Sequence, residues 1–155
     1  HRLIQAFQNL ELAGYKLVLV GGAANHFRIH LDANYENIIM TGFVSDNELS
    51  KLYAKCDFFV YPSLYEGFGI PPLEAMKNGC PIIVSNIPSL LEVCGEAAYY
   101  VDPYNVKDIE NAIKELIGNC NLRKDLILKG IIRSQAFNWE ESGLKVLDLI
   151  REVKK

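Results

Sequence analysis

The stretch "DFFVYPSLYEGFGIPPLEAMKNGCPIIVS", residues 57–85, contains the pattern that decides the fold. It opens with an apolar run at 57–62, passes through a loop with two glycines and a double proline, and closes with a second apolar run at 81–85. Short apolar runs bounded by glycine or proline are typical of buried parallel strands. The residues from about Pro71 to Lys77 predict a short helix between the runs, so the stretch indicates a strand–helix–strand unit.

The same alternation continues on both sides of this unit. Apolar runs at 16–22 and 37–42 predict two earlier strands, and the run at 97–103 predicts a fifth. Alternation of this kind predicts an α/β, Rossmann-like doubly wound domain in which helices cover a parallel sheet. The other helices are expected at 2–12, after Ser45, at 88–94, at 106–117, at about 122–136 and at 139–153.

Two helix starts have recognisable capping residues. Ser45 and Glu48 have the spacing of a capping box, in which each side chain bonds the backbone N–H of the other residue. Asn138 is expected to cap the last helix, and Trp139 beside it is expected in the core or on an interdomain surface. The pattern also predicts that one face of this last helix packs inward through Val146, Leu147 and Ile150.

Composition bounds the class of protein. The chain has 155 residues, 50% of them hydrophobic, which suits a single domain with a packed core. A net charge of −3 without a lysine–arginine cluster gives no support to nucleic-acid binding. No apolar run reaches the roughly 18 residues that a membrane span requires, and no signal peptide is visible.

The cysteines and histidines suggest no site of their own. The four cysteines are widely spaced, which favours buried, reduced thiols in a cytosolic protein. His26 and His30 have a spacing that binds zinc on some helices, but no third ligand is evident, so solvent exposure is favoured. We therefore predict no metal site. The four cysteines mentioned above are Cys56, Cys80, Cys94 and Cys120.

The loop after the strand at 57–62 is the most informative candidate for a binding site, because ligands of such sheets lie at the carboxyl ends of the strands. Gly67 and Gly69 allow a tight turn and a close approach of the backbone to a ligand. Pro71 suits the first turn of the following helix. The amide N–H groups of Phe68, Gly69 and Ile70 are then free at a positive helix end, which suits a phosphate.

Two carboxylates flank this loop, Glu66 at its start and Glu74 about one turn into the helix. Acids beside a phosphate make sense if the ligand also carries hydroxyl groups, which carboxylates bind well. Phosphate with a sugar at each end describes a nucleotide sugar. The alternative is structural: Glu74 would complement the helix dipole and Glu66 would be a solvated turn residue. A nicotinamide dehydrogenase is disfavoured, because "GFGIPP" is not a GxGxxG fingerprint.

Three segments carry a resemblance to a known family: "LVLVGG" at 17–22, the whole of 37–103, and "LRKDLILKGIIRSQAFNWEE" at 122–141. Together they resemble the C-terminal half of a retaining GT-B glycosyltransferase of glycosyltransferase family 4, the group 1 glycosyl transferases. The central signature of that family, two acids separated by seven residues, is matched by Glu66 and Glu74 within "PSLYEGFG" and "PLEAM".

The resemblance implies a role for each matching position. Glu74 resembles the acid that holds the ribose hydroxyls of the nucleotide, and Glu66 resembles the catalytic-site acid that contacts the donor sugar. The remaining matches act through the backbone: Phe68, Gly69 and Ile70 toward the donor sugar and diphosphate, Phe43 and Val44 toward the base, and Gly21 and Gly22 as a turn at the interdomain cleft.

The resemblance also implies the reaction of the full-length enzyme. It would transfer a mannose- or glucose-type hexose, with retention, from a UDP- or GDP-linked donor to a glycan or lipid-linked acceptor, as in polysaccharide biosynthesis. The family requires no cofactor or metal as a rule, and no DxD motif occurs here. A cytoplasmic location, with possible peripheral association with a membrane, fits such an enzyme.

The start of the chain predicts a longer protein. The first helix begins at His1 with no cap residue and no preceding strand. We therefore expect residues 1–155 to be a nucleotide-sugar-binding domain cut from a larger enzyme. The family's basic pair and its acceptor domain would lie upstream, so the isolated domain should be a poor catalyst. The alternatives are a non-enzymatic nucleotide-binding module and one half of a split glycosyltransferase.

Overall fold

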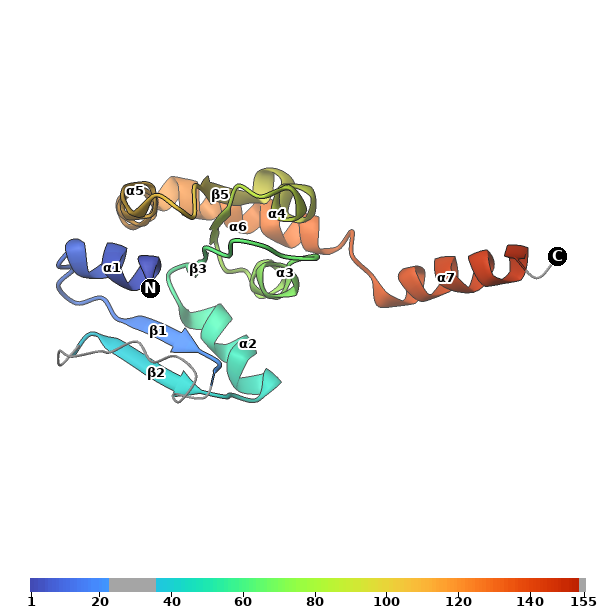
Figure 1. Ribbon diagram of the computed structural model, residues 1–155, viewed down its shortest axis with the longest axis horizontal. Coiled ribbons are helices and arrows are strands. Elements are labelled where there is room, and N and C mark those ends of the chain that lie inside the picture. Colours follow the sequence, from blue (N-terminus) through green and yellow to red (C-terminus); the bar gives the residue numbers. More distant parts are fainter. Residues whose placement is uncertain (23–35, 154–155) are drawn as a thin grey trace.

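The computed structural model describes residues 1–22 and 36–153. His26 and His30 lie outside these residues, so the structure does not test the prediction made for them. Helices and strands alternate along the described chain, as the sequence predicts (Figure 1). In the described residues, no helix is both long enough and apolar enough to cross a membrane.

The strands form parallel sheets. β1 (Leu17–Val20) pairs with β2 (Ile38–Gly42), while β3 (Phe59–Tyr61), β4 (Ile82–Ser85) and β5 (Ala98–Val101) form a second sheet in the order β3-β4-β5. The α/β class and the parallel pairing are confirmed. The expected single sheet is instead two hydrogen-bonded units, because the three-residue β3 forms its described ladder with β4 alone.

The described chain contains seven α-helices, of which the first six lie around these strands (Figure 1). Most follow the predicted limits within a few residues, and the helix at 88–94 matches its prediction at both ends. Their bounds are α1 (Arg2–Asn9), α2 (Asp46–Lys55), α3 (Ile70–Lys77), α4 (Pro88–Cys94), α5 (Val106–Gly118), α6 (Cys120–Ser134) and α7 (Trp139–Val153), with a short 3₁₀ helix η1 (Gly95–Ala97) before β5.

Of the boundaries that differ from the sequence prediction, two have clear local reasons. The predicted helix at 2–12 ends at Asn9, because Glu11 has a φ of 45°, which an α-helix does not accommodate. The predicted strand at 97–103 ends at Val101, because Asp102 begins a turn in which its carboxylate accepts a hydrogen bond from the Tyr104 amide at 2.9 Å. A backbone conformation sets the first limit and a side-chain hydrogen bond accompanies the second, so hydrophobicity alone decides neither.

The helices cover both faces of the three-stranded sheet, which makes the domain doubly wound. Ile82 and Val84 of β4 pack toward a cluster that includes buried residues of α2, α3 and α4. Ile83, between them, packs with residues of α1, α5 and α6 on the opposite face. Successive strand residues point to opposite faces, so β4 is buried on both. Because β4 is packed on both faces, it provides a rigid support for the loops at the carboxyl ends of the strands.

Capping explains where α2 starts. The Ser45 hydroxyl accepts a hydrogen bond from the Glu48 amide at 3.4 Å, and the Glu48 carboxylate accepts from the Ser45 amide at 2.9 Å. The predicted capping box is therefore confirmed. Asn138 also acts at the start of α7, where its side-chain oxygen accepts from the Glu140 amide at 2.8 Å.

The prediction of an inward-packing face on α7 is wrong. Val146, Leu147 and Ile150 are all about half exposed, and none of the described residues of α7 is buried. Figure 1 shows the helix extending away from the rest of the domain. Trp139 is 85% exposed, which rules out the core placement that the sequence left open. Amphipathic periodicity predicts that a helix has an apolar face, but it does not say what covers that face.

Candidate functional site

The loop between β3 and α3 ends at Gly69, whose backbone conformation allows the turn into the helix. This glycine precedes the first residue of α3 and has a φ of 109°, a conformation that residues with a Cβ rarely adopt. A Cβ placed there would lie 2.5 Å from Cδ2 of Leu90, a fully buried side chain of α4. The backbone conformation and the close contact therefore both require glycine.

The start of α3 presents unused hydrogen-bond donors. Within the described chain, no hydrogen bond uses the amide N–H of Phe68, Gly69 or Ile70. Pro71 and Pro72 follow in the first turn of the helix and have no amide N–H to offer. The three free donors thus lie at the positive end of the helix, the arrangement that the sequence predicts for an anion.

Glu66 is held by the strand that precedes the loop. The Tyr61 hydroxyl, at the end of β3, donates a hydrogen bond to Oε1 of Glu66 at 2.5 Å. Burial and then this bond raise the pKa of Tyr61, so the tyrosine stays a donor at neutral pH. The interaction fixes one carboxylate oxygen of the half-buried Glu66 and leaves the other available for a ligand.

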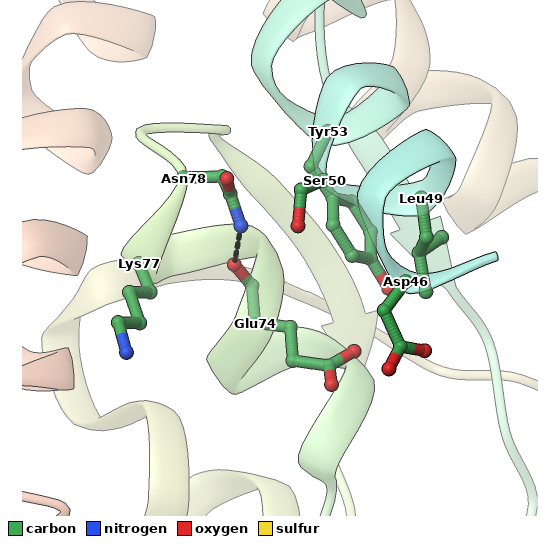
Figure 2. Close-up of a pocket in the computed structure, with 7 residues that line it drawn as sticks. All are labelled: Asp46, Leu49, Ser50, Tyr53, Glu74, Lys77 and Asn78. Carbon is green, nitrogen blue, oxygen red and sulfur yellow. Dashed lines mark hydrogen bonds between the residues drawn. The ribbon is translucent and has the colours of Figure 1, made fainter.

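Glu74 lies in a pocket between α2 and α3. Figure 2 shows its carboxylate extending from α3 toward Asp46 at the start of α2. The pocket has a volume of about 360 Å³. Its lining residues are Asp46, Leu49, Ser50 and Tyr53 of α2, with Glu74, Lys77 and Asn78 from α3 and its C-terminal cap.

The charge of Asp46 acts on Glu74 within this pocket. Partial burial and then the charge of Asp46 raise the pKa of Glu74. Two acids that face one space repel each other in the absence of a ligand, and hydroxyl groups placed between them would relieve that repulsion by donating hydrogen bonds. The pocket is therefore suited to a ligand rich in hydroxyl groups rather than to a second anion.

A smaller pocket of about 230 Å³ lies on the other side of the glycine loop. Gly67 and Phe68 form one wall, and Arg133 and Phe137 form another. The Phe68 ring packs edge-on against Phe137 with centroids 5.6 Å apart, and the Arg133 guanidinium lies 5.1 Å from the Phe137 centroid. Arg133 also donates to backbone oxygens of α4, including Val93 O at 2.9 Å, so the end of α6 supports the loop.

The remaining predicted positions lie together at the carboxyl ends of β1 and β2. Gly21 and Gly22 have φ values of 90° and 74°, and the Gly21 amide donates to Gly42 O at 2.9 Å. Phe43 follows directly and is 92% exposed, with Val44 half-buried beside it. The Phe43–Val44 turn leads through Ser45 into Asp46, so it is continuous with the wall of the Glu74 pocket.

Sequence reasoning missed several residues that the fold brings to these pockets. Asp46 and Tyr53 line the larger pocket, and Arg133 and Phe137 line the smaller one. The only local signal was the position of Asp46 in the first turn of a capped helix, where an acid is explained by the helix dipole alone. Among the described residues, no group of three or more potential metal ligands lies together.

Comparison with known proteins identifies the family of the chain. A family profile described as "Glycosyl transferases group 1" matches residues 1–133.

The chain belongs to this family.

A curated relative in Escherichia coli, O-antigen chain mannosyltransferase B, is 42% identical over 107 residues, which are 69% of this chain and 28% of that protein. The match to this group 1 family member therefore covers less than a third of that relative.

Solved structures show the same fold. Sucrose-phosphate synthase from Thermosynechococcus elongatus superposes with a TM-score of 0.86 at 26% identity, over 98% of this chain and 42% of that one. Anabaena HepE in complex with UDP-glucose gives a TM-score of 0.86 at 20% identity, over 98% and 44% of the two chains. The described domain thus has the architecture found in part of each of these larger proteins, which confirms the GT-B assignment of the fold.

Proposed function

We propose that this chain is the donor-binding domain of a retaining hexosyltransferase that uses a nucleoside diphosphate sugar. The observation that carries the proposal is that Glu74 of α3 shares a pocket with Asp46, while unused amides lie at the start of the same helix. One site then offers donors for phosphate oxygens and an acceptor for sugar hydroxyls. Nucleotide sugars carry both kinds of group.

The two ends of the donor would lie on different elements. Glu74, with Asp46 facing it, would accept hydrogen bonds from the ribose hydroxyls, and the adjacent Phe43–Val44 turn would meet the base. The amides of Phe68, Gly69 and Ile70 would bind the diphosphate. Glu66, fixed by Tyr61, would then contact the transferred sugar.

The proposed reaction replaces one bond at the anomeric carbon by another on the same face of the sugar. The bond to the diphosphate oxygen breaks, a bond to an acceptor hydroxyl oxygen forms, and the hydroxyl proton is transferred to the departing diphosphate. Backbone amides and cations supplied from outside this chain would stabilise the negative charge that develops, so no metal ion is required. The full-length enzyme would act on a glycan or lipid-linked acceptor on the cytoplasmic side of a membrane.

The comparisons support the donor class and favour a mannose- or glucose-type sugar. The relative cited above is named a mannosyltransferase, and the Anabaena neighbour was solved with UDP-glucose. In the proposal, the two acids of the pocket favour hydroxyl groups and the amides at the start of α3 favour phosphate, and neither feature selects one sugar. Both uracil and guanine nucleotides are therefore candidates for the test.

A titration tests the proposal directly. We expect UDP or GDP to shift the amide signals of residues 66–74 and of Phe43 and Val44, with affinity on the order of 0.1–1 mM, because one domain encloses only part of a ligand. Inorganic phosphate at the same concentration is the control, since it lacks the ribose that Glu74 would bind. Equal shifts with phosphate, or shifts confined to the opposite edge of the sheets, would contradict the proposal.

A further inference from the structure

A pair of cysteines lies behind the Glu74 pocket. The Sγ atoms of Cys56 and Cys80 are 3.3 Å apart, although the residues are 24 positions apart in the sequence. Cys56 caps the C-terminal end of α2, and Cys80 lies between α3 and β4. Both are free thiols in the structure. Two elements that form the walls of the pocket are therefore joined, at one end, by a thiol–thiol contact.

The two thiols differ in their accessibility. Cys56 is exposed and Cys80 is buried, with 2% of its surface accessible. The sequence predicted buried thiols at all four positions, so the exposure of Cys56 and Cys120 corrects that prediction. An exposed thiol beside a buried one is the arrangement in which the first reacts with a reagent from solution and the second completes the reaction internally.

Their hydrogen bonding favours the same order of reaction. The neighbouring Cys80 thiol, as a hydrogen-bond partner, lowers the pKa of Cys56, whereas that contact and burial raise the pKa of Cys80. A lower pKa increases the thiolate fraction of Cys56, and the thiolate is the nucleophile in thiol–disulfide exchange. Cys56 is thus the attacking residue on grounds of both access and charge.

We propose that Cys56 and Cys80 are an oxidisable pair that forms an intramolecular disulfide with a low-molecular-weight disulfide as oxidant, tying α2 to the segment after α3. The Sγ atoms must approach by roughly 1.3 Å to reach the usual bond length of about 2.05 Å. The formation of this bond does not depend on the proposed glycosyl transfer.

The reaction proceeds by two exchange steps. The Cys56 thiolate attacks one sulfur of the oxidant, whose S–S bond breaks and releases one thiolate. The Cys80 thiolate then attacks Sγ of Cys56, breaks the mixed S–S bond and releases the second thiolate. Two protein thiols are oxidised, the oxidant is reduced to two thiols, and the two protons lost by the cysteines are taken up by those products.

The disulfide would act on the pocket through α2. Tyr53 lines the pocket and lies one turn before Cys56, whose Sγ is 3.5 Å from the Tyr53 carbonyl oxygen. A covalent bond at this end of α2 would draw the helix toward α3 and change the space between Tyr53 and Glu74. The redox state of the pair would therefore alter the dimensions of the pocket.

Oxidation of the full chain with oxidised glutathione tests the pair. After alkylation of the remaining thiols, trypsin separates Cys56 on residues 56–77 from Cys80 and Cys94 on 78–107. A second cleavage after Glu92 then separates Cys80 from Cys94. We expect mass spectrometry to show a Cys56–Cys80 link with loss of both thiols from alkylation, while Cys94 and Cys120 remain alkylated. The amide signals of Tyr53 and Glu74 should shift on oxidation.

Three variants provide the controls. Cys56→Ser should abolish the link and the shifts, while Cys120→Ser, which changes the other exposed thiol, should leave both intact. Cys80→Ser should stop the reaction at a glutathione adduct on Cys56. Because Cys80 is buried, this variant can fail to fold, and in that case the peptide mapping of the wild-type chain is the deciding measurement. A stable adduct in the wild-type chain, a link to another cysteine or an intermolecular dimer through Cys56 overturns the pair. A link without shifts at Tyr53 and Glu74 overturns its coupling to the pocket.

Discussion

Glu74 and Asp46 face each other across the pocket between α3 and α2 (Figure 2). Two carboxylates therefore line one space, and among the described residues neither forms an ion pair, although Lys77 lines the same pocket. Partial burial raises the pKa of Glu74 most, and the charge of Asp46 raises it further. Such an arrangement costs free energy in the empty protein, and a ligand that donates hydrogen bonds to the acids would offset that cost.

The first prediction concerns stability and pH. The folded-state pKa of Glu74 is raised above its ordinary value of 4.5, so the folded protein binds this proton more tightly than the unfolded chain does. The associated stability is present below pH 4.5 and is lost as the pH rises through the higher folded pKa. Glu74→Gln should therefore be more stable than the wild type at neutral pH, by less than about 1 kcal/mol because the side chain is exposed.

Urea unfolding across a range of pH measures this difference. The gain should disappear at low pH, where Glu74 is neutral in both states. Glu96→Gln, which changes an exposed acid outside the pocket, is the matched control and should show no comparable gain. Asp46→Asn should lower the pKa of Glu74, which NMR titration reads directly. An unchanged pKa in that variant would mean that the two carboxylates do not interact.

The second prediction is that the same Glu74→Gln substitution weakens nucleotide binding. The amide keeps the shape of the side chain but replaces charge-assisted hydrogen bonds by neutral ones, so affinity should fall by about 1–3 kcal/mol. Calorimetric titration with UDP and GDP measures the loss, again with Glu96→Gln as control. A stabilised variant that binds nucleotide as well as the wild type would remove Glu74 from the site.

The third prediction separates two glycines of one loop. Gly69→Ala introduces a Cβ at a φ of 109° and 2.5 Å from the buried Leu90, so we expect a loss of about 2–4 kcal/mol in the free energy of unfolding. Gly67→Ala meets no atom within 4 Å and should cost less than about 1 kcal/mol. Chemical denaturation of both variants checks the contrast. Equal costs would show that the turn does not depend on Gly69.

The fourth prediction concerns Glu66 in the full-length enzyme. Since Glu66 is expected to contact the transferred sugar, Glu66→Ala should lower kcat/KM much more than it lowers the affinity for plain UDP or GDP. Tyr61→Phe removes the hydrogen bond that fixes one oxygen of Glu66 and should produce a smaller loss of the same kind. Equal losses in turnover and nucleotide binding would make Glu66 a general binding residue instead.

The fifth prediction concerns metal ions. Amides at the start of α3 and cations outside this chain are proposed to balance the phosphate charge, so treatment with EDTA should leave the activity of the full-length enzyme largely unchanged. Activity is measured before and after chelation, with a metal-dependent transferase treated in parallel. Complete loss that is restored by Mn²⁺ or Mg²⁺ would contradict the proposed mechanism.

The sequence by itself determined the elements and half of the candidate site. Pro88 and Gly95 bound α4 at the predicted residues, and Ser45 with Glu48 placed the start of α2, because these signals act between neighbours in the chain. The spacing of Gly69, Pro71 and Glu74 likewise predicted a helix start with free amides. Periodicity and capping are local properties, so one sequence is enough to recognise them.

Only the tertiary structure decided which elements meet. Asp46 approaches Glu74, and Cys56 approaches Cys80, because α2 packs against α3 through contacts between residues far apart in the chain. The apolar face of α7 shows the same limit, since its pattern predicted burial and the fold leaves it exposed. A hydrophobic pattern indicates that burial of a helix face would be favourable, but the element that covers this face depends on the packing of the whole chain.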